Sequence, residues 1–427
     1  MMRSVIVFVD LIVILFVSVL PLYAGGIFNK QNLSADYLRS LTRNASTDAA
    51  DIVAYNPAGI MKLDNGLYAK LDAMYFDKQY RNTVPDVYPF GGEDGTFETD
   101  EPTIVPGFFT VYKRDKWAGY FAITIPGGGG KAEYPDGNAR TVQLAASIIA
   151  NSGGTLVGID DMFLEGDSIQ TGFTLGGALD ISKMVSIAGG VRYVDATQSL
   201  AGVADLLTAF STVARFEIDL EREAAGWSYF LGVNVAPVKK LNIGFLYMSN
   251  TKLDWETDVI KDDVGVTPAL GWDEKQRNDL PGVLGLGLAY RIIDPVLFEI
   301  NYTRYLETQA ALDERRFESP GDSFDLGMSV TYAFHPQWRA SLGYMYTDIR
   351  GMDNESLRPE APELDANTIA GGIVYSPIDR FEISLGYTDV SYDSVTTTDP
   401  YSTQAPAGTE LAKDVWAVSL GLQYRFF

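Results

Sequence analysis

Apolar residues alternate with small or polar residues along most of this chain, from Gly66 to its last residue. A two-residue period is typical of β-strands that turn an apolar face one way and a polar face the other. In the stretch 295–308, one face carries Val296, Phe298, Ile300 and Tyr302, and the other carries Leu297, Glu299, Asn301 and Thr303. The pattern recurs at 338–347, 381–388 and 416–426. No apolar run of about 18 residues follows the first segment, so the sequence predicts strands and not membrane-spanning helices.

Alternation alone fits both a soluble β-sandwich and a membrane β-barrel. The links between strands separate the two, because short and long links alternate. Short links fall at 114–116, 182–183, 238–240, 293–295, 335–337 and 377–379, and long links at 77–102, 127–168, 199–223, 254–280, 310–321, 350–364 and 391–411. Short periplasmic turns and long external loops are typical of outer-membrane barrels. The fold class predicted is therefore an all-β membrane protein, an antiparallel transmembrane β-barrel of about 14 strands.

Aromatic residues lie toward the ends of the predicted strands, as expected for two interfacial girdles. They are Trp117, Trp227, Tyr247, Trp338, Tyr346, Tyr387 and Trp416. The barrel must close, because open strand edges in hydrocarbon would leave backbone groups without partners. The chain ends in Tyr424-Arg425-Phe426-Phe427, and this terminal aromatic resembles the signal that barrel-assembly machinery recognises, which makes that machinery an expected partner.

The first 24 residues read as a secretory signal peptide. Arg3 precedes the apolar run from Leu11 to Leu20, and the small residue Ala24 offers a cleavage site. Asp10 shortens the apolar run below the roughly 20 residues that a bilayer span needs, which disfavours the alternative of a retained anchor. The mature chain is therefore expected outside the cytoplasm. Its 33 basic and 56 acidic residues, a net charge of -23, disfavour nucleic acid and anionic membrane surfaces as partners.

The composition also argues against most classes of enzyme. The chain has no Cys and one His, which excludes disulfides, thiolate nucleophiles and most zinc sites. That residue, His335, precedes Pro336 in a short turn, and no serine nucleophile motif accompanies it. We therefore predict no enzymatic activity, no cofactor and no metal. Gly285 and Gly287 resemble part of a dinucleotide motif, but they lie within a predicted strand and are expected to be lumen-facing spacers.

Residues 25–65 lack strand alternation and precede the first predicted strand. A barrel of about 14 strands encloses a lumen too wide for its own side chains to fill, so it either conducts water or holds a plug. We predict that residues 25–65 form a hatch inside a barrel that spans 66–427. A general porin for small polar solutes, with no plug, is the alternative.

Within this segment, Asp48-Ala49-Ala50-Asp51 leads to Asn56-Pro57-Ala58, just before the first strand. This resembles the hatch of FadL-type outer-membrane channels for long-chain fatty acids and toluene-like hydrocarbons. Further matches lie at 105–106, 226–227, 278–281 and 294–295, so the resemblance covers the mature chain. It implies passive uptake of hydrophobic compounds, with Asn56, Pro57 and Ala58 at the gate. The ligand would be captured among external loops, held in a pocket beside the hatch, and released sideways at a kinked third strand.

The third predicted strand, Trp117 to Ile125, runs into Pro126, Gly127, Gly128 and Gly129. Proline removes a ladder donor and glycine offers no side chain, so these four residues are the candidate lateral opening. An ordinary flexible loop start is the alternative, whereas a phosphate-binding loop lacks its Gly-Lys-Ser/Thr end.

Two long loops show helical spacing. The first contains Val142, Ala145, Ile148 and Ile149, and the second contains Val203, Leu206, Leu207, Phe210 and Val213. We predict short helices in these external loops. Ile148, Ile149, Phe163, Leu206 and Phe210 would line the capture groove, unless the helices only pack on each other.

Lumen parity predicts an apolar pocket with one cation, made by Met74, Phe76, Arg192, Phe230, Leu246 and Met248. Fatty-acid members of the family pair the ligand carboxylate with basic residues, and Arg192 is the nearest candidate, although a family arginine aligns with Asp195 here. Arg192 can instead pair with Asp180 or Glu299, which would favour an uncharged hydrocarbon. The expected partners are hydrophobic small molecules or fatty acids, outer-membrane lipid and lipopolysaccharide, and the chain is expected to be a monomer. A surface adhesin or receptor role for the long acidic loops is a further alternative.

Overall fold

The computed structural model describes residues 33–85, 95–263, 276–311, 321–349, 359–398 and 405–427. The expected signal peptide, residues 1–24, and the first residues of the expected hatch, 25–32, lie outside this part of the chain. None of the described helices is long and apolar enough to cross a membrane.

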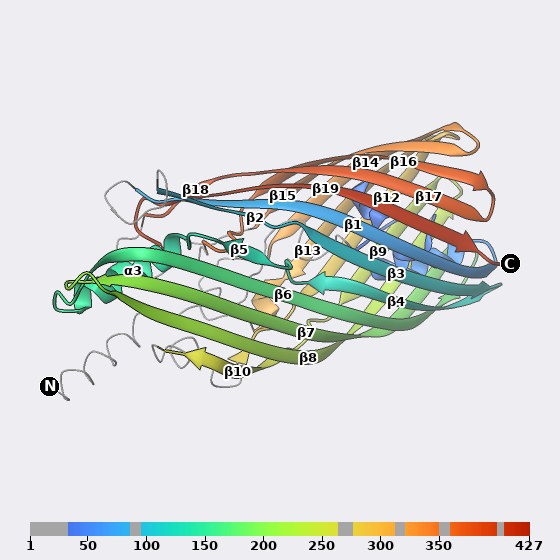
Figure 1. Cartoon of the computed structure of the whole chain (residues 1–427). Coiled ribbons are helices and arrows are strands. Elements are labelled where there is room, and N and C mark those ends of the chain that lie inside the picture. The colour runs from blue at the N-terminus through green and yellow to red at the C-terminus, as the bar shows by residue number, and fades with distance from the viewer. Residues whose placement is uncertain (1–32, 86–94, 264–275, 312–320, 350–358, 399–404) are drawn as a thin grey trace.

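The chain forms a closed barrel of 14 antiparallel strands (Figure 1). The wall strands are β1 (Gly66–Thr83), β3 (Thr103–Arg114), β4 (Trp117–Gly127), β6 (Leu156–Asp180), β7 (Val185–Thr208), β8 (Val213–Val238), β9 (Leu241–Met248), β12 (Gly282–Ile293), β13 (Val296–Leu306), β14 (Phe324–His335), β15 (Trp338–Asp348), β16 (Ala366–Ile378), β17 (Phe381–Tyr392) and β19 (Glu410–Arg425). Each pairs with its neighbours in the sequence, and β1 closes the ring by pairing with both β3 and β19.

Shorter strands extend the ladders beyond the wall. They are β2 (Thr96–Asp100) beside β1, β5 (Ala132–Tyr134) beside β6, β10 (Asp254–Asp262) beside β8, β11 (Gln276–Arg277) beside β10, and β18 (Val395–Thr396) beside β19. The predicted class, strand number and antiparallel order are confirmed.

The predicted parity is also confirmed. On β13, Ile300 is 39% exposed, whereas Glu299, Asn301 and Thr303 are buried inside the ring. On β15, Leu342 is 74% exposed and Ser341 is buried. The apolar face therefore points outward, as a wall in lipid requires, and the polar face lines the lumen.

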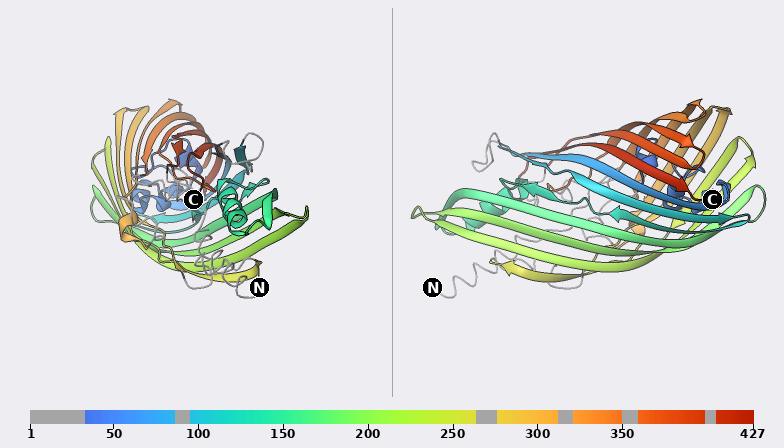
Figure 2. Two further views of the ribbon diagram at one scale, coloured as in Figure 1. Left: turned by 90° about the vertical axis from the view of Figure 1, so that its left-hand side faces the viewer. Right: turned by 45° about the vertical axis from the view of Figure 1, so that its right-hand side comes forward.

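The predicted short links are two-to-four-residue turns at one end of the barrel, where the C-terminus also lies (Figure 1). The opposite end carries the long connections. There β6, β7 and β8 extend far beyond the other strands (Figure 2). The predicted loop at 199–223 is wrong, because β7 runs to Thr208 and β8 begins at Val213. Cross-strand pairs such as Leu200–Leu220 and Leu206–Ala214 continue the ladder through this segment.

One of the two predicted loop helices is present. Helix α3 (Ala139–Asn151) begins at Asn138, whose side chain accepts hydrogen bonds from the N–H groups of Arg140 and Thr141 at 3.1 Å. The second expected helix, from Val203 to Val213, is wrong, because these residues belong to β7, β8 and the hairpin between them. The apolar residues there recur irregularly because β7 also packs against α3 on one face.

The described N-terminal segment, residues 33–65, lies inside the ring near the short-turn end (Figure 2). It contains α2 (Ala35–Leu38) and two 3-10 helices, η2 (Ala50–Ala54) and η3 (Pro57–Lys62). A third short 3-10 helix, η6 (Glu307–Gln309), follows β13. Proline at the start of η3 costs nothing, because the first N–H of a helix has no partner within it.

Candidate functional site

A buried ion network holds the N-terminal segment together. Arg43 bridges Asp51 at 2.6 Å and Asp48 at 2.8 Å, and Arg39 lies 2.5 Å from Asp36. Burial alone would raise the pKa of Asp36, but Lys70, Arg39 and Arg43 outweigh burial and hold that pKa well below its usual value. The carboxylate of Asp36 is therefore ionised, which the network requires.

The same network reaches the wall. Lys70 of β1 lies 3.0 Å from Asp36 and 2.5 Å from Asp72, its neighbour on the same lumenal face. Arg339 of β15 lies 3.7 Å from Asp48 and 2.7 Å from Glu382. Removing one partner of such a buried set leaves an uncompensated charge, so these contacts bind the segment strongly to its place.

Lumenal side chains also hydrogen-bond the backbone of the segment. The donors and acceptors come from strands round much of the ring: Ser186 to Ala58, Asn242 to Ala45, Ser341 to Arg39, Thr388 to Leu38, Ser419 to Ala35, and Gln423, whose side chain accepts from the N–H of Ala50. The lengths run from 2.5 to 3.2 Å. These bonds explain the polar parity of the lumen, because each satisfies a backbone group that is shielded from water.

Lumenal glycines give the segment room. A Cβ at Gly287 would lie 2.5 Å from the backbone nitrogen of Ala45, and one at Gly327 would lie 2.6 Å from the carbonyl oxygen of Leu41. Gly285 and Gly287 are therefore lumen-facing, as expected from the sequence. Glycine thus leaves space in the wall where the segment passes.

Asn56, Pro57 and Ala58 lie against β7, β8 and β9. The Asn56 amide donates to the carbonyl oxygens of Asn44 and Val233, both at 3.1 Å, and so ties the segment to itself and to β8. A larger residue opposite it would crowd this side chain, because a Cβ at Gly232 would lie 2.6 Å from the Asn56 side-chain oxygen.

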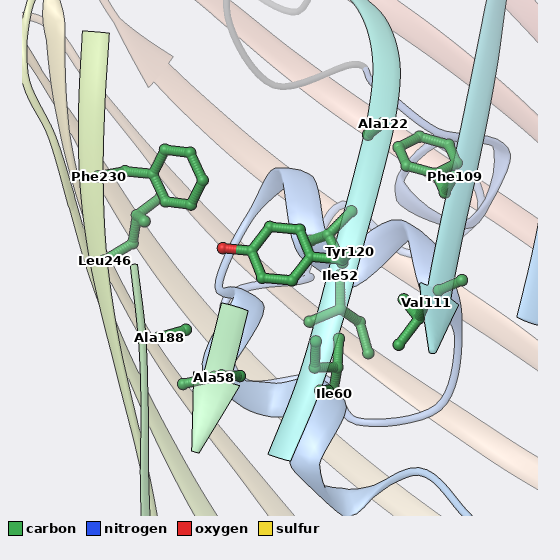
Figure 3. Packing of buried hydrophobic residues seen from close by; sticks show 14 of the residues in the cluster. Ile52, Ala58, Ile60, Phe109, Val111, Tyr120, Ala122, Ala188, Phe230 and Leu246 are labelled. Atoms are coloured by element: carbon green, nitrogen blue, oxygen red, sulfur yellow. The ribbon is translucent and has the colours of Figure 1, made fainter. Parts of the chain in front are cut away.

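The segment makes a different contact with β3 and β4, an apolar one. Ile52 and Ile60 pack with Phe109 and Val111 of β3 and with Tyr120 and Ala122 of β4 (Figure 3). Phe230 and Leu246 complete this apolar cluster from β8 and β9, and the rings of Tyr120 and Phe230 are 6.3 Å apart.

All six predicted pocket residues face the lumen and are buried, but they lie in separate places. Phe230 pairs with Met248 across β8 and β9, and both belong to the apolar cluster with Leu246. Met74 and Phe76 lie in another cluster with Tyr37, Leu38 and Tyr55, and the two clusters share only Ala54.

Arg192, the sixth, stands opposite Ser228 on β8, two residues from Phe230. No carboxylate in the described ranges lies within ion-pair distance of it, and its Nε has no hydrogen-bond partner there. Of the two partners weighed from the sequence, Glu299 accepts a hydrogen bond from Ser46 at 2.8 Å, and Asp180 forms no ion pair with Arg192.

The wall between β3 and β4 is only partly paired. Backbone pairs join the two strands from Arg114–Trp117 to Phe108–Ile123, and residues 103–107 of β3 pair with β1 alone. On the other side, the register between β4 and β6 shifts between Thr124 and Gly127. Pro126 lies at this shift and Pro106 on the facing part of β3, and neither has an N–H to donate.

The glycines that follow are tightly placed. Gly128 and Gly130 have φ of +85° and +71°, a region that favours glycine. Lys78 of β1 donates to the carbonyl oxygens of Gly129 and, at 3.1 Å, of Lys131. Arg192 lies just inside, because a Cβ at Gly172 would be 3.1 Å from Pro126 Cδ and 3.3 Å from Arg192 Cδ.

Gln170 has the same setting as Arg192. It is fully buried, pairs with Gly127 in register, and both its amide atoms lack a hydrogen-bond partner among the described residues. Gln170 and Lys78 were not predicted as site residues. Parity could have identified them, because polar residues on the lumenal face next to the Pro-Gly break are visible in the sequence.

The residues predicted to form a capture groove also lie in different environments. Ile148 of α3 and Leu206 of β7 are buried in one cluster with Met162 and Leu164, and Ile149 packs at its edge. Phe163 has the opposite parity, and Phe210, at the hairpin tip between β7 and β8, is 85% exposed.

Comparison with solved structures confirms the fold. A FadL homologue of Pseudomonas aeruginosa matches with a TM-score of 0.67 at 15% identity, over 95% of this chain and 100% of that one. The toluene transporter TodX of Pseudomonas putida matches with a TM-score of 0.62 at 13% identity, over 90% and 96%. The toluene transporter TbuX of Ralstonia pickettii matches with a TM-score of 0.60 at 13% identity, over 92% and 98%.

No curated protein sequence matches this chain. The sequence model of the outer membrane protein transport protein family (OMPP1/FadL/TodX) matches residues 163–426, more than half of the chain. Members of that family are β-barrels in the outer membrane of Gram-negative bacteria. The chain therefore belongs to the OMPP1/FadL/TodX family of outer-membrane transport proteins.

Proposed function

We propose that this chain is a passive channel that takes up hydrophobic compounds and releases them sideways into the outer membrane. The observation that carries the proposal is the coincidence of three features at one place. The unpaired stretch between β3 and β4 lies beside the apolar cluster and beside the buried Arg192. The route thus needs no passage along the barrel axis, which the N-terminal segment occupies.

The apolar contact favours this side of the barrel for movement of a ligand. On the other sides of the lumen the segment is also held by hydrogen bonds and ion pairs, which a hydrophobic ligand cannot replace, and even the second apolar cluster, around Met74 and Phe76, lies beside Lys70 and its ion pairs. Against β3 and β4 it is held by Ile52 and Ile60 packing on Phe109 and Tyr120, contacts that an apolar ligand can exchange for its own. A compound leaving between the strands enters acyl chains, into which its apolar surface partitions favourably.

We infer that Arg192 selects compounds that carry one oxygen-bearing group, with a long-chain carboxylate as the best fit. Its buried guanidinium lacks a described carboxylate partner, and Gln170, on the lumenal face of the neighbouring strand β6, offers an unpaired amide. A ligand carboxylate would give Arg192 its missing partner, whereas a pure hydrocarbon would leave it unsatisfied, at a cost of about 1–3 kcal/mol. Phe230, Leu246 and Met248 would take the chain, and Met248 suits varied shapes.

Capture is proposed to begin at the apolar cluster under α3, near Ile148, Ile149 and Leu206, with Phe163 and Phe210 on the neighbouring strands. The cluster is packed, so α3 would have to lift to admit a ligand. The alternative of a general porin is disfavoured by the N-terminal segment and its buried ion network. No observation on the described residues favours an adhesin.

The test is uptake by cells that lack their own channels for hydrophobic compounds. We expect wild-type chain to support uptake of oleate. Replacing residues 126–129 with Thr-Val-Thr-Val, which restores strand-forming residues at the break, should reduce uptake to the level of cells without the channel. Gly153→Asn is the matched control, because Gly153 has a positive φ and open space around it. Unchanged uptake by the 126–129 variant would refute the lateral route.

Arg192→Met separates ligand class from route. It should reduce oleate uptake about tenfold or more, corresponding to about 1.4 kcal/mol or more, and leave toluene uptake unchanged. An equal loss for both compounds, or none for either, would refute carboxylate recognition. Liposome swelling in arabinose tests the porin alternative, and rapid swelling by the intact chain would favour it.

A further inference from the structure

A cavity of about 640 Å³ opens at the short-turn end of the barrel, away from the break between β3 and β4. Its lining comes from Arg39, residues 45–48 and Lys62 of the N-terminal segment, from the turns that join β6 to β7, β8 to β9, and β12 to β13 with the adjoining strand ends, and from β14 and β15. Short turns are periplasmic in barrels of this kind, so the cavity faces the periplasm.

The charge of this cavity is opposite to that of the chain. Seven cationic side chains line it, namely Arg39, Lys62, Lys183, Lys239, Lys240, Arg291 and Arg339, against the carboxylates of Asp48 and Glu299. The whole chain has a net charge of -23. A local excess of cations in so acidic a protein focuses a positive potential at the mouth of the cavity.

Five of these cations have no partner of opposite charge in the described part of the chain. Both carboxylates are already engaged, Asp48 with Arg43 at 2.8 Å and Glu299 with Ser46 at 2.8 Å. Arg39 and Arg339 belong to the ion network. Lys62, Lys183, Lys239, Lys240 and Arg291 form no ion pair with any described residue, and Arg291 donates to the carbonyl oxygen of Asp294 at 2.7 Å. The four lysines can therefore bind an anion without breaking an existing ion pair.

Most of the lining area of the cavity is apolar. The apolar part is formed by Ala45, Val238, Leu241, Ala289, Pro295 and Leu297. The volume of the cavity falls within the roughly 300–1,000 Å³ of small-molecule sites. A concave apolar surface ringed by lysines fits a small molecule with an alkyl chain and an anionic head better than it fits a flat protein surface.

We propose that this cavity is a binding site for a single-chain amphiphilic oxyanion, a carboxylate or phosphate attached to an alkyl chain. The head contacts Lys183, Lys239 and Lys240 at the mouth, and the chain lies on Val238, Leu241 and Leu297. The cavity shares no lining residue with the apolar cluster or with the unpaired stretch between β3 and β4, so the proposal does not depend on the lateral route.

Photolabelling tests this site on the purified mature chain in a non-ionic detergent. The probe is a twelve-carbon carboxylate with a diazirine on its alkyl chain, and adducts are mapped by mass spectrometry. We expect adducts in peptides covering 236–242 and 289–297. Decanoate, decyl phosphate, decanol, inorganic phosphate and an oligoglutamate peptide serve as competitors.

The variant is Lys183→Gln/Lys239→Gln/Lys240→Gln, with Lys116→Gln as matched control. Lys116 is exposed in the β3–β4 turn and does not line the cavity. The triple variant should weaken competition by decanoate or decyl phosphate about tenfold or more, and the control should leave it unchanged. The stronger of these two competitors identifies the head group. Heat-modifiable migration on gels verifies that each variant is folded.

Several outcomes would overturn the proposal. Decanol competing as well as decanoate would make the site merely apolar, and inorganic phosphate competing as well as decyl phosphate would make the alkyl chain irrelevant. Competition by oligoglutamate alone would indicate an acidic protein partner. Identical labelling of the triple variant and Lys116→Gln would place the probe elsewhere. None of these results bears on oleate uptake, so failure here is distinct from failure of the proposed transport function.

Discussion

Adding a single methyl group to the lumenal wall should displace the N-terminal segment. Gly287 of β12 pairs with Gly244 of β9 and Asn301 of β13 in the middle of the wall. A Cβ there would lie 2.5 Å from the backbone nitrogen of Ala45 and 2.8 Å from the carbonyl carbon of Asn44. Both neighbours are backbone atoms, which cannot rotate away, so Gly287→Ala forces the segment itself to move.

Overpacking of this kind costs about 1–3 kcal/mol. About 1.4 kcal/mol corresponds to a factor of ten. The ratio of molecules with the segment in place to molecules with it displaced should therefore fall roughly 5- to 140-fold. Single-channel recording in planar bilayers measures this ratio as the fraction of time spent open. Gly119→Ala is the matched control, because a Cβ at Gly119 meets nothing within 4 Å.

The wild-type chain and Gly119→Ala should therefore be closed for nearly all of the recording, and Gly287→Ala should show openings at least about five times as frequent. Gly244→Ala provides a second reading, because its Cβ would overlap the carbonyl oxygen of Asn44. If both lumenal variants fold and spend no more time open than Gly119→Ala, the close fit between wall and segment does not control the opening of the barrel.

Three further predictions concern the contacts around the segment and the wall break. Lys78→Met removes the donor to the carbonyl oxygens of Gly129 and Lys131, so amide hydrogen exchange at 128–131 should accelerate about tenfold, whereas Lys252→Met should not change it. Asn56→Leu leaves the carbonyl oxygens of Asn44 and Val233 without their donor, and should lower the free energy of unfolding in urea by about 1–3 kcal/mol, with an unchanged midpoint counting against the contact. Acid should protonate Asp36 and Asp48 only far below neutrality. Partial burial would raise the pKa of Asp48, but Arg43, Arg339 and Arg39 lower it to about 2, and cations hold the pKa of Asp36 well below its usual value. Carboxylates with depressed pKa stabilise the folded state above their unfolded pKa and lose this contribution as the pH falls through the folded value. Both carboxylates should thus stay ionised from pH 8 to about pH 4, and a protonated carboxyl at either position near pH 6, detected by isotope-edited infrared spectroscopy, would contradict the assigned ion pairs.

The barrel could be predicted because its determinants are local. Alternation along β13, with Ile300 outward and Glu299 inward, follows from the pleat of a single strand. The short turns are also local signals, and together they fixed the strand number and the end at which both termini of the barrel lie.

The extension of β7 and β8 could not be predicted in this way. Leu206 is buried against α3 and Phe210 is exposed at a hairpin tip, so the apolar residues there follow packing by a distant helix and not the pleat. Strand pairing such as Leu206–Ala214 is set by partners across the sheet. The helix predicted from Val203 to Val213 therefore fitted the spacing of the apolar residues but was wrong.

The pocket was partly visible for a similar reason. Parity correctly turned Met74 and Phe230 inward, but it could not say where along the lumen each would meet the N-terminal segment. That depends on the register of the strands and on the path of residues 33–65. Lys70 and Asp72 share the lumenal face of Met74, and these two charges could have indicated the buried ion network, which was not predicted.

Planar-bilayer conductance of the mature chain, compared with a variant that lacks residues 25–65, tests most directly whether the segment closes the lumen. We expect low conductance from the intact chain and a sharp rise on deletion, with folding of both barrels checked by heat-modifiable migration. Long-chain fatty acid should not open the intact chain to ions, since the ligand leaves through the wall. Equal and large conductance from both proteins would contradict the account and indicate a general porin.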